Sequence, residues 1–132
     1  MPTILFLCVA NSARSQMAEG LARAAAPDGY RFLSAGSQPG QLNPLAVAAL
    51  REDGIDISHH RAKGLDAIPL DDVDTIVTLC AEEVCPVVPA RVQRLHWPLA
   101  DPARVEGSPD ERLAAFRAAR DRLRELLPRL WA

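Results

Sequence analysis

The chain has 132 residues, 48% of them hydrophobic and 24% charged, which is the size and composition of one globular domain with its own core. Fifteen basic residues against seventeen acidic ones give a net charge of −2, and this balance argues against nucleic acid or a charged membrane surface as a partner. We therefore expect residues 1–132 to form a single domain, and we expect a monomer.

The apolar stretches are too short for a membrane protein. The longest, residues 4–10, falls far short of the roughly 20 residues of a membrane helix and lacks the basic segment of a signal peptide. A cytoplasmic location is therefore predicted. In that reducing compartment, three cysteines are more typical of catalysis, redox chemistry or metal binding than of structural disulfides.

The first half of the chain predicts alternating strands and helices. Thr3–Cys8 is continuously apolar, as in a strand buried on both faces, and residues 15–26 have helical spacing before a Pro-Asp-Gly stop. Residues 31–35 are a second strand candidate. Asn43 and Pro44 then cap a helix that runs to about Asp53.

The second half continues the alternation. Residues 74–79 and 92–97 are strand candidates, and Ser108-Pro109-Asp110-Glu111 has the pattern of a capping box that opens a last helix. That helix carries one apolar stripe: Leu113, Phe116, Leu123, Leu127 and Leu130. The pattern predicts an α/β fold with a four-stranded, mostly parallel sheet and helices on both faces.

Chemically useful residues follow the strands of this predicted sheet. Cys8 ends the first strand, Cys80 follows the third, and Asp101 lies after the fourth. Because parallel sheets bind ligands at the carboxyl ends of their strands, we expect these residues to share one edge.

The loop between the first strand and the first helix has the form of an oxyanion cradle. Its backbone N–H groups can surround a tetrahedral anion at the helix N-terminus, and Arg14 can close the ring with its guanidinium fork. The same donors stabilise a thiolate at Cys8, and the Ser15 hydroxyl can also reach that sulfur. No Gly-Lys-Ser/Thr follows, which argues against nucleoside triphosphates. The expected substrate-binding residues are Val9, Ala10, Asn11, Ser12, Ala13, Arg14 and Ser15.

This segment resembles the phosphate loop of the low-molecular-weight tyrosine phosphatase superfamily. The resemblance implies the corresponding fold and a left-handed conformation at Asn11, which suits asparagine. Ala13 departs from many relatives, which carry a further cysteine there. Asp101-Pro102 resembles the general acid of these phosphatases, although an Asp before Pro also commonly initiates a turn.

Cys80 and Cys85 are five residues apart directly after a strand. No partner motif completes a zinc site, so we expect no metal there, and the pair is either two small buried side chains or part of a thiol relay. Residues five apart on a helix are about 7.5 Å apart along its axis, so a Cys80–Cys85 disulfide requires a non-helical segment.

The wider sequence resembles the thioredoxin-coupled arsenate reductases. The matching segments, in order, are residues 15–19, 54–58, 77–80 and 96–102. The resemblance implies attack of Cys8 on arsenate, a Cys8–Cys80 disulfide, exchange to Cys80–Cys85, and recycling by thioredoxin, with phosphate or sulfate as competing oxyanions and no bound cofactor. The oxidised pair is expected to be exposed for thioredoxin by a redox switch.

Some relatives bind potassium near the loop, and Asn11, Glu19 and Ser34 fit that pattern. Arg61 and Lys63, however, stand where those relatives carry neutral and acidic ligands. A built-in ammonium therefore replaces the ion, and we predict no activation by potassium.

Three alternatives remain open from the sequence. A phosphomonoester hydrolase needs Cys8, Arg14 and Asp101 alone, but the tyrosines that such phosphatases place after Asp-Pro are missing, since the chain's one tyrosine is Tyr30. A non-catalytic protein that binds arsenic(III) through its thiols is the second. The third is a reductase that uses glutathione or mycothiol in place of thioredoxin.

Overall fold

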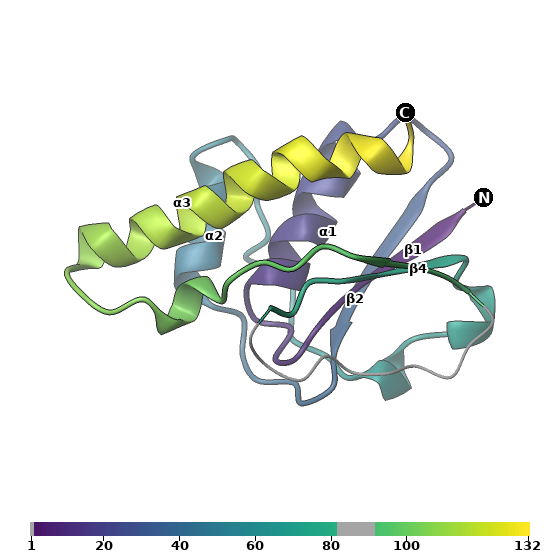
Figure 1. The fold of residues 1–132 in the computed structure, drawn as a ribbon, viewed down its shortest axis with the longest axis horizontal. Helices are drawn as coiled ribbons and strands as arrows, with labels where there is room; N and C mark the ends of the chain where they lie inside the picture. Colours follow the sequence, from purple (N-terminus) through teal and green to yellow (C-terminus); the bar gives the residue numbers. More distant parts are fainter. Residues whose placement is uncertain (1, 82–91) are drawn as a thin grey trace.

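The computed structural model describes residues 2–81 and 92–132 and contains one four-stranded sheet (Figure 1). All its strand pairs are parallel, in the order β2-β1-β3-β4. The strands are β1 (Thr3–Cys8), β2 (Arg31–Gly36), β3 (Thr75–Thr78) and β4 (Gln93–His96). The α-helices are α1 (Arg14–Ala25), α2 (Pro44–Arg51) and α3 (Pro109–Leu126). The predicted α/β fold is confirmed.

The two faces of the sheet are covered differently. Alternation along β1 sends Ile4 and Phe6 toward the α-helices, and Leu5 and Leu7 toward the opposite face. That second face is covered by two short 3₁₀ helices, η1 (Leu65–Ala67) and η2 (Leu70–Asp72), rather than by α-helices, as the teal turns below the sheet in Figure 1 show. Helices therefore lie on both faces, but all three α-helices lie on one.

The helix ends follow the capping signals in the sequence. The Asn43 side chain accepts a hydrogen bond from the Leu45 N–H at 2.9 Å, and Ser108 and Glu111 form the predicted capping box at the start of α3. Beyond α3 the chain tightens into the 3₁₀ helix η4 (Leu127–Leu130). No helix within the described residues has the length and apolarity that crossing a membrane requires.

The strand order creates a crevice between β1 and β3. From β1 the chain crosses to β2 on one side, and from β2 it returns past β1 to β3 on the other. Such a reversal of direction leaves open space at the carboxyl ends of the two central strands. Cys8 ends β1 and Cys80 follows β3, so both predicted thiols lie at this reversal point.

Candidate active site

The loop between β1 and α1 turns its backbone carbonyls outward. Four of these carbonyls accept a hydrogen bond from the segment that follows β2, with donor N–H to acceptor oxygen distances as follows: Ser37 to Cys8 3.3 Å, Gln38 to Val9 2.9 Å, Gly40 to Ala10 3.0 Å and Asn43 to Ser12 2.9 Å. In a trans peptide the N–H points opposite to the preceding carbonyl. The N–H groups of Val9, Ala10, Asn11 and Ala13 therefore point to the inside of the loop, as an oxyanion cradle requires.

The Cys8 sulfur lies at the centre of this loop. The Asn11 N–H donates a hydrogen bond to Sγ at 3.2 Å, and the Ser15 hydroxyl lies 2.9 Å from Sγ, the contact expected from the sequence. Cys8 is 2% exposed. These two contacts hold the sulfur inside the loop, where a nucleophile can reach a bound oxyanion.

Asn11 connects the loop to two other parts of the fold. Its φ of 51° is left-handed, as the sequence predicted, and among the described residues it is the one non-glycine with positive φ. Its amide Nδ2 donates to Ser15 Oγ at 2.8 Å, and its Oδ1 accepts from the Lys63 N–H at 3.0 Å. The Asn11 side chain fixes the serine that contacts the nucleophile. Its hydrogen bonds offset the energetic cost of the left-handed backbone conformation.

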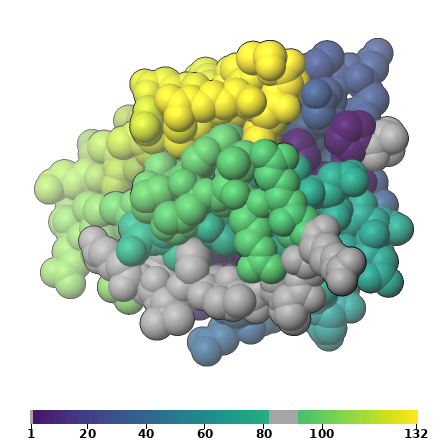
Figure 2. Space-filling view, turned by 45° about the vertical axis from the view of Figure 1, so that its right-hand side comes forward, coloured from purple at the N-terminus to yellow at the C-terminus, as the bar shows by residue number. Residues whose placement is uncertain are grey.

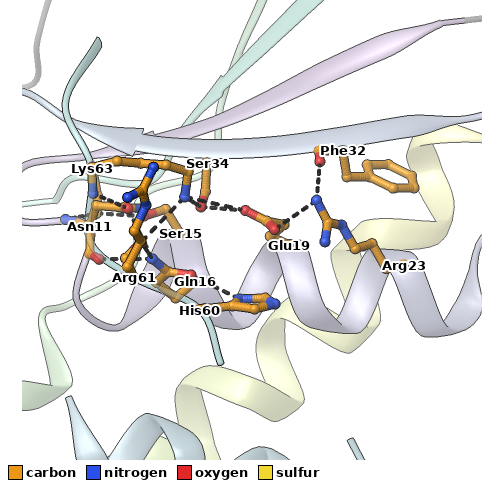
Figure 3. A network of polar contacts seen from close by, with 11 residues as sticks. Asn11, Ser15, Gln16, Glu19, Arg23, Phe32, Ser34, His60, Arg61 and Lys63 are labelled. Carbon is orange, nitrogen blue, oxygen red and sulfur yellow. Dashed lines mark hydrogen bonds and ion pairs between the residues drawn. The ribbon is translucent and has the colours of Figure 1, made fainter. Parts of the chain in front are cut away.

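Gln16 supports the loop through hydrogen bonds that the sequence analysis did not predict. Its Nε2 donates to Asn11 Oδ1 at 2.9 Å and to the Arg61 carbonyl at 2.8 Å, and its Oε1 lies 3.0 Å from His60 Nδ1 (Figure 3). Burial lowers the pKa of His60, although the charge of Glu19 opposes the shift. A neutral imidazole with its proton on Nδ1 satisfies the glutamine oxygen.

A buried carboxylate lies on the same side of α1 as this network. Glu19 is 4% exposed and is neutralised from two directions, by Arg23 at 3.0 Å and by the Lys63 ammonium at 3.8 Å, with a hydrogen bond of 2.5 Å from the Ser34 hydroxyl (Figure 3). Lys63 Nζ also donates to Ser34 Oγ at 3.2 Å. Burial lowers the pKa of Lys63, and the charge of Glu19 opposes that shift.

Arg14 is held beneath the pocket by backbone carbonyls at the ends of two strand segments. Its Nη1 donates to the carbonyl of Leu99 at 3.0 Å and to that of Leu79 at 3.4 Å, and its Nη2 lies 3.8 Å from Asp101 Oδ2. The side chain is 5% exposed. These contacts fix the position of the guanidinium at the wall of the cavity that the loop lines.

The loop forms the wall of a cavity of about 130 Å³. Its lining residues are Cys8, Val9, Ala10, Ser12, Ala13, Arg14, Asp101 and Arg104. Asn11 and Ser15 are fully buried and support the sulfur. A larger cavity of about 450 Å³, beside the start of β2, contains none of the predicted site residues. The sequence analysis did not predict Arg104 as a site residue. Its position, three residues after the candidate general acid Asp101, was the signal that could have identified it.

Asp101 begins a turn, and its carboxylate also faces the cavity. Its Oδ1 accepts from the Ala103 N–H at 3.0 Å and so caps the 3₁₀ helix η3 (Pro102–Arg104), while its Oδ2 faces Arg14 inside the cavity. The carboxylate side chain is 25% exposed, so protons can reach it from water. A turn-initiating aspartate and a candidate general acid are here one residue.

Cys80 lies at the end of the neighbouring strand. Leu7 pairs with Thr78, and the Leu79 N–H continues the pairing with a 3.0 Å bond to the Leu7 carbonyl. Parallel strands about 4.8 Å apart with a rise of about 3.3 Å bring positions offset by one residue to a Cα separation of about 6 Å. A disulfide spans that distance. Cys8 and Cys80 are both buried thiols, and Cys85 lies outside the described residues.

The chain is similar to known proteins in both sequence and fold. The family model of low molecular weight phosphotyrosine protein phosphatases matches residues 3–132. An arsenate reductase of Bacillus licheniformis is 45% identical over 129 residues, which cover 96% of this chain and 93% of that protein. A solved arsenate reductase in a phosphate-binding state superposes with a TM-score of 0.82 at 31% identity, covering 98% and 96% of the two chains. A thioredoxin-dependent arsenate reductase of Corynebacterium glutamicum gives a TM-score of 0.70 at 31% identity, covering 96% of this chain and 60% of that one.

Proposed function

The chain belongs to the low molecular weight phosphotyrosine protein phosphatase family, and on that premise we propose that it is an arsenate reductase. The observation that carries the proposal is the pairing of β1 with β3. Cys80 follows β3, the strand that pairs with the strand ending at Cys8, and this supports a relay between two buried thiols, which a phosphatase does not need. Reduction of arsenate to arsenite takes two electrons, which the Cys8 and Cys80 thiols supply when they form a disulfide.

The first step is nucleophilic. Arsenate lies in the loop against the inward N–H groups and Arg14, and the Cys8 thiolate attacks arsenic. A sulfur–arsenic bond forms and one arsenic–oxygen bond breaks. The departing oxygen leaves as water after taking a proton from Asp101 or solvent. Arsenic is still pentavalent in this adduct.

The second step transfers two electrons. The Cys80 thiolate attacks the Cys8 sulfur, a Cys8–Cys80 disulfide forms, and the electron pair of the sulfur–arsenic bond stays on arsenic, which leaves as arsenite. Cys85 then attacks Cys80, which releases the Cys8 thiolate and forms Cys80–Cys85. The dithiol of thioredoxin reduces that bond, and the likeness to a thioredoxin-dependent reductase supports this reductant.

The test is arsenate-dependent oxidation of NADPH in the presence of thioredoxin and thioredoxin reductase. The wild type turns over continuously, and Cys85→Ser stops after one turnover per enzyme because its Cys8–Cys80 disulfide has no resolving thiol. Mass spectrometry identifies that disulfide in the variant and Cys80–Cys85 in the oxidised wild type. Absence of arsenate-dependent oxidation in the wild type refutes the proposal, and continued turnover of Cys85→Ser refutes the relay.

A phosphomonoester hydrolase is the second candidate, because Cys8, Arg14 and Asp101 line one cavity. Among the described residues, no aromatic side chain lines this cavity, and Tyr30 stacks on Phe32 at the start of β2, the end remote from Cys8. An aryl phosphate therefore gains no ring contact there. Hydrolysis of p-nitrophenyl phosphate that matches or exceeds arsenate reduction, and is unaffected by Cys80→Ser, would favour this candidate.

We also propose that potassium does not activate this protein. The Lys63 ammonium already supplies a cation to Glu19 and Ser34, the oxygen donors that an ion would use. Potassium chloride should leave wild-type turnover equal to that in sodium chloride. In Lys63→Ala the carboxylate loses this cation, so potassium should raise turnover relative to sodium; a potassium response in the wild type contradicts the proposal.

We propose a cytoplasmic location, because thioredoxin keeps thiols reduced in that compartment. We propose further that residues 1–132 form a single domain, as a family model matching residues 3–132 supports. Phosphate and sulfate should compete with arsenate for the loop, since their shape and charge are similar.

A further inference from the structure

A second arginine lines the cavity, outside the oxyanion loop. Arg104 lines the cavity together with the loop residues and comes from η3, the short turn after Asp101. Figure 2 shows the segment after β4, in green, at the surface beside the yellow C-terminal helix. Arg104 is exposed, so it meets a ligand as the ligand enters or leaves.

The short helix η3 connects Arg104 to Asp101. Asp101 is the N-cap of η3 and Arg104 is its last residue, and both line the same cavity. The Arg104 N–H donates to the Asp101 carbonyl at 3.2 Å, and Pro102 between them is buried. The turn therefore brings an arginine to the cavity that contains the candidate general acid.

The position of this guanidinium matters for one oxygen of the ligand. When three oxygens of a tetrahedral anion face the loop N–H groups and Arg14, the fourth points away from the Cys8 sulfur, toward the mouth. In an unsubstituted oxyanion this oxygen carries charge or a hydroxyl and accepts a strong hydrogen bond from arginine. In a monoester it is the bridging oxygen, a weaker acceptor whose organic group extends into the same space.

We propose that Arg104 is a specificity-determining residue that binds the outward oxygen and selects unsubstituted oxyanions over their monoesters. This inference rests on the proposed function only in taking a tetrahedral oxyanion as the ligand of the loop. It adds a discriminating contact at the mouth of the cavity. No aromatic side chain among the described residues lines the cavity, and this strengthens the same preference. An ester gains neither a charge pair with Arg104 nor a ring contact.

The test measures binding and does not depend on turnover. Alkylation of Cys8 by iodoacetamide is followed by mass spectrometry while inorganic phosphate, sulfate or phenyl phosphate is titrated as a protecting ligand. In Arg104→Gln the half-protecting concentration of both inorganic anions should rise at least about tenfold, the loss of one charge-assisted hydrogen bond, and that of phenyl phosphate less than about twofold. Arg104→Lys should restore part of the difference.

Arg112→Gln is the matched control, because it removes the same charge from an exposed position in the first turn of α3. It should change neither value. An equal rise for inorganic anions and phenyl phosphate in Arg104→Gln overturns the inference in favour of general electrostatic attraction, and no rise overturns it outright. A wild type that binds phosphate but does not reduce arsenate refutes the proposed function and leaves this inference to be decided by the same titration.

Discussion

At the scale of single residues, the site depends on a close contact between two backbones. Gly36 ends β2, where an added Cβ would lie 2.3 Å from the Val9 carbonyl oxygen and 2.8 Å from the Asn11 nitrogen. Both atoms belong to the oxyanion loop and cannot move without turning its N–H groups. The absence of a side chain at this position allows the segment after β2 to hold the loop.

Gly36→Ala should therefore distort the loop. We expect a loss of stability of about 1–3 kcal/mol, as for overpacking elsewhere, and a loss of kcat/KM on the order of a hundredfold from misplaced donors. Gly40→Ala is the control, because its added Cβ would meet Ala10 Cβ at an ordinary 3.8 Å. Chemical denaturation and steady-state kinetics measure both effects. Equal behaviour of the two variants would show that the loop tolerates the displacement.

At the scale of elements, α2 and α3 are joined by a charge cluster remote from the site. Glu52, at the end of α2, accepts hydrogen bonds from Arg117 at 2.6 Å and from Arg120 at 2.9 Å. The hydrogen bond from Arg117, followed by that from Arg120, lowers the pKa of Glu52 to about 2. The helices that cover the sheet are thus held together by ionised groups as well as by apolar packing.

This pKa sets the direction of a pH effect on stability. Because the folded-state pKa of about 2 lies below the ordinary value of 4.5, the contribution of Glu52 is complete above about pH 4.5 and is lost as pH falls toward 2. Glu52→Gln should lower the free energy of unfolding at pH 7 and flatten its decline over that window. Denaturant titrations at a series of pH values measure this effect. The control is Glu125→Gln, which removes an exposed ion pair with Arg122 inside α3. An unchanged slope in Glu52→Gln would contradict the assignment.

At the scale of the whole molecule, the surface formed by the described residues offers little apolar area for self-association. Across residues 2–81 and 92–132, Val105 is the one large hydrophobic side chain that is exposed, at 40%. Stable homodimers bury extended apolar areas, and a lone valine does not supply one. The net charge of −2 adds no attraction between copies.

We therefore expect a monomer in solution. Sedimentation velocity of the reduced protein should give a mass near 14.3 kDa at all concentrations tested. The variant Val105→Ser should sediment in the same way, because that side chain is not part of an interface. A concentration-dependent rise in mass that Val105→Ser abolishes would show instead that this residue mediates dimerisation.

Local sequence patterns were sufficient to predict several parts of this protein. Hydrophobic runs, capping residues and the spacing of Cys8 and Arg14 predicted the strands, the α-helices and the oxyanion loop, because each depends on neighbours within a few residues. Asn11 was likewise predicted to be left-handed, from side-chain chemistry and resemblance together.

Contacts between distant segments complete the site, and local patterns in the sequence could not predict them. Gln16 reaching Arg61, Gly36 against Val9, and Arg104 over the cavity all join residues that no local periodicity relates. The 3₁₀ helices on the second face escaped prediction for the same reason, since short turns depend more on packing than on propensity. Local chemistry specifies the loop, and long-range packing specifies what holds it and what it selects.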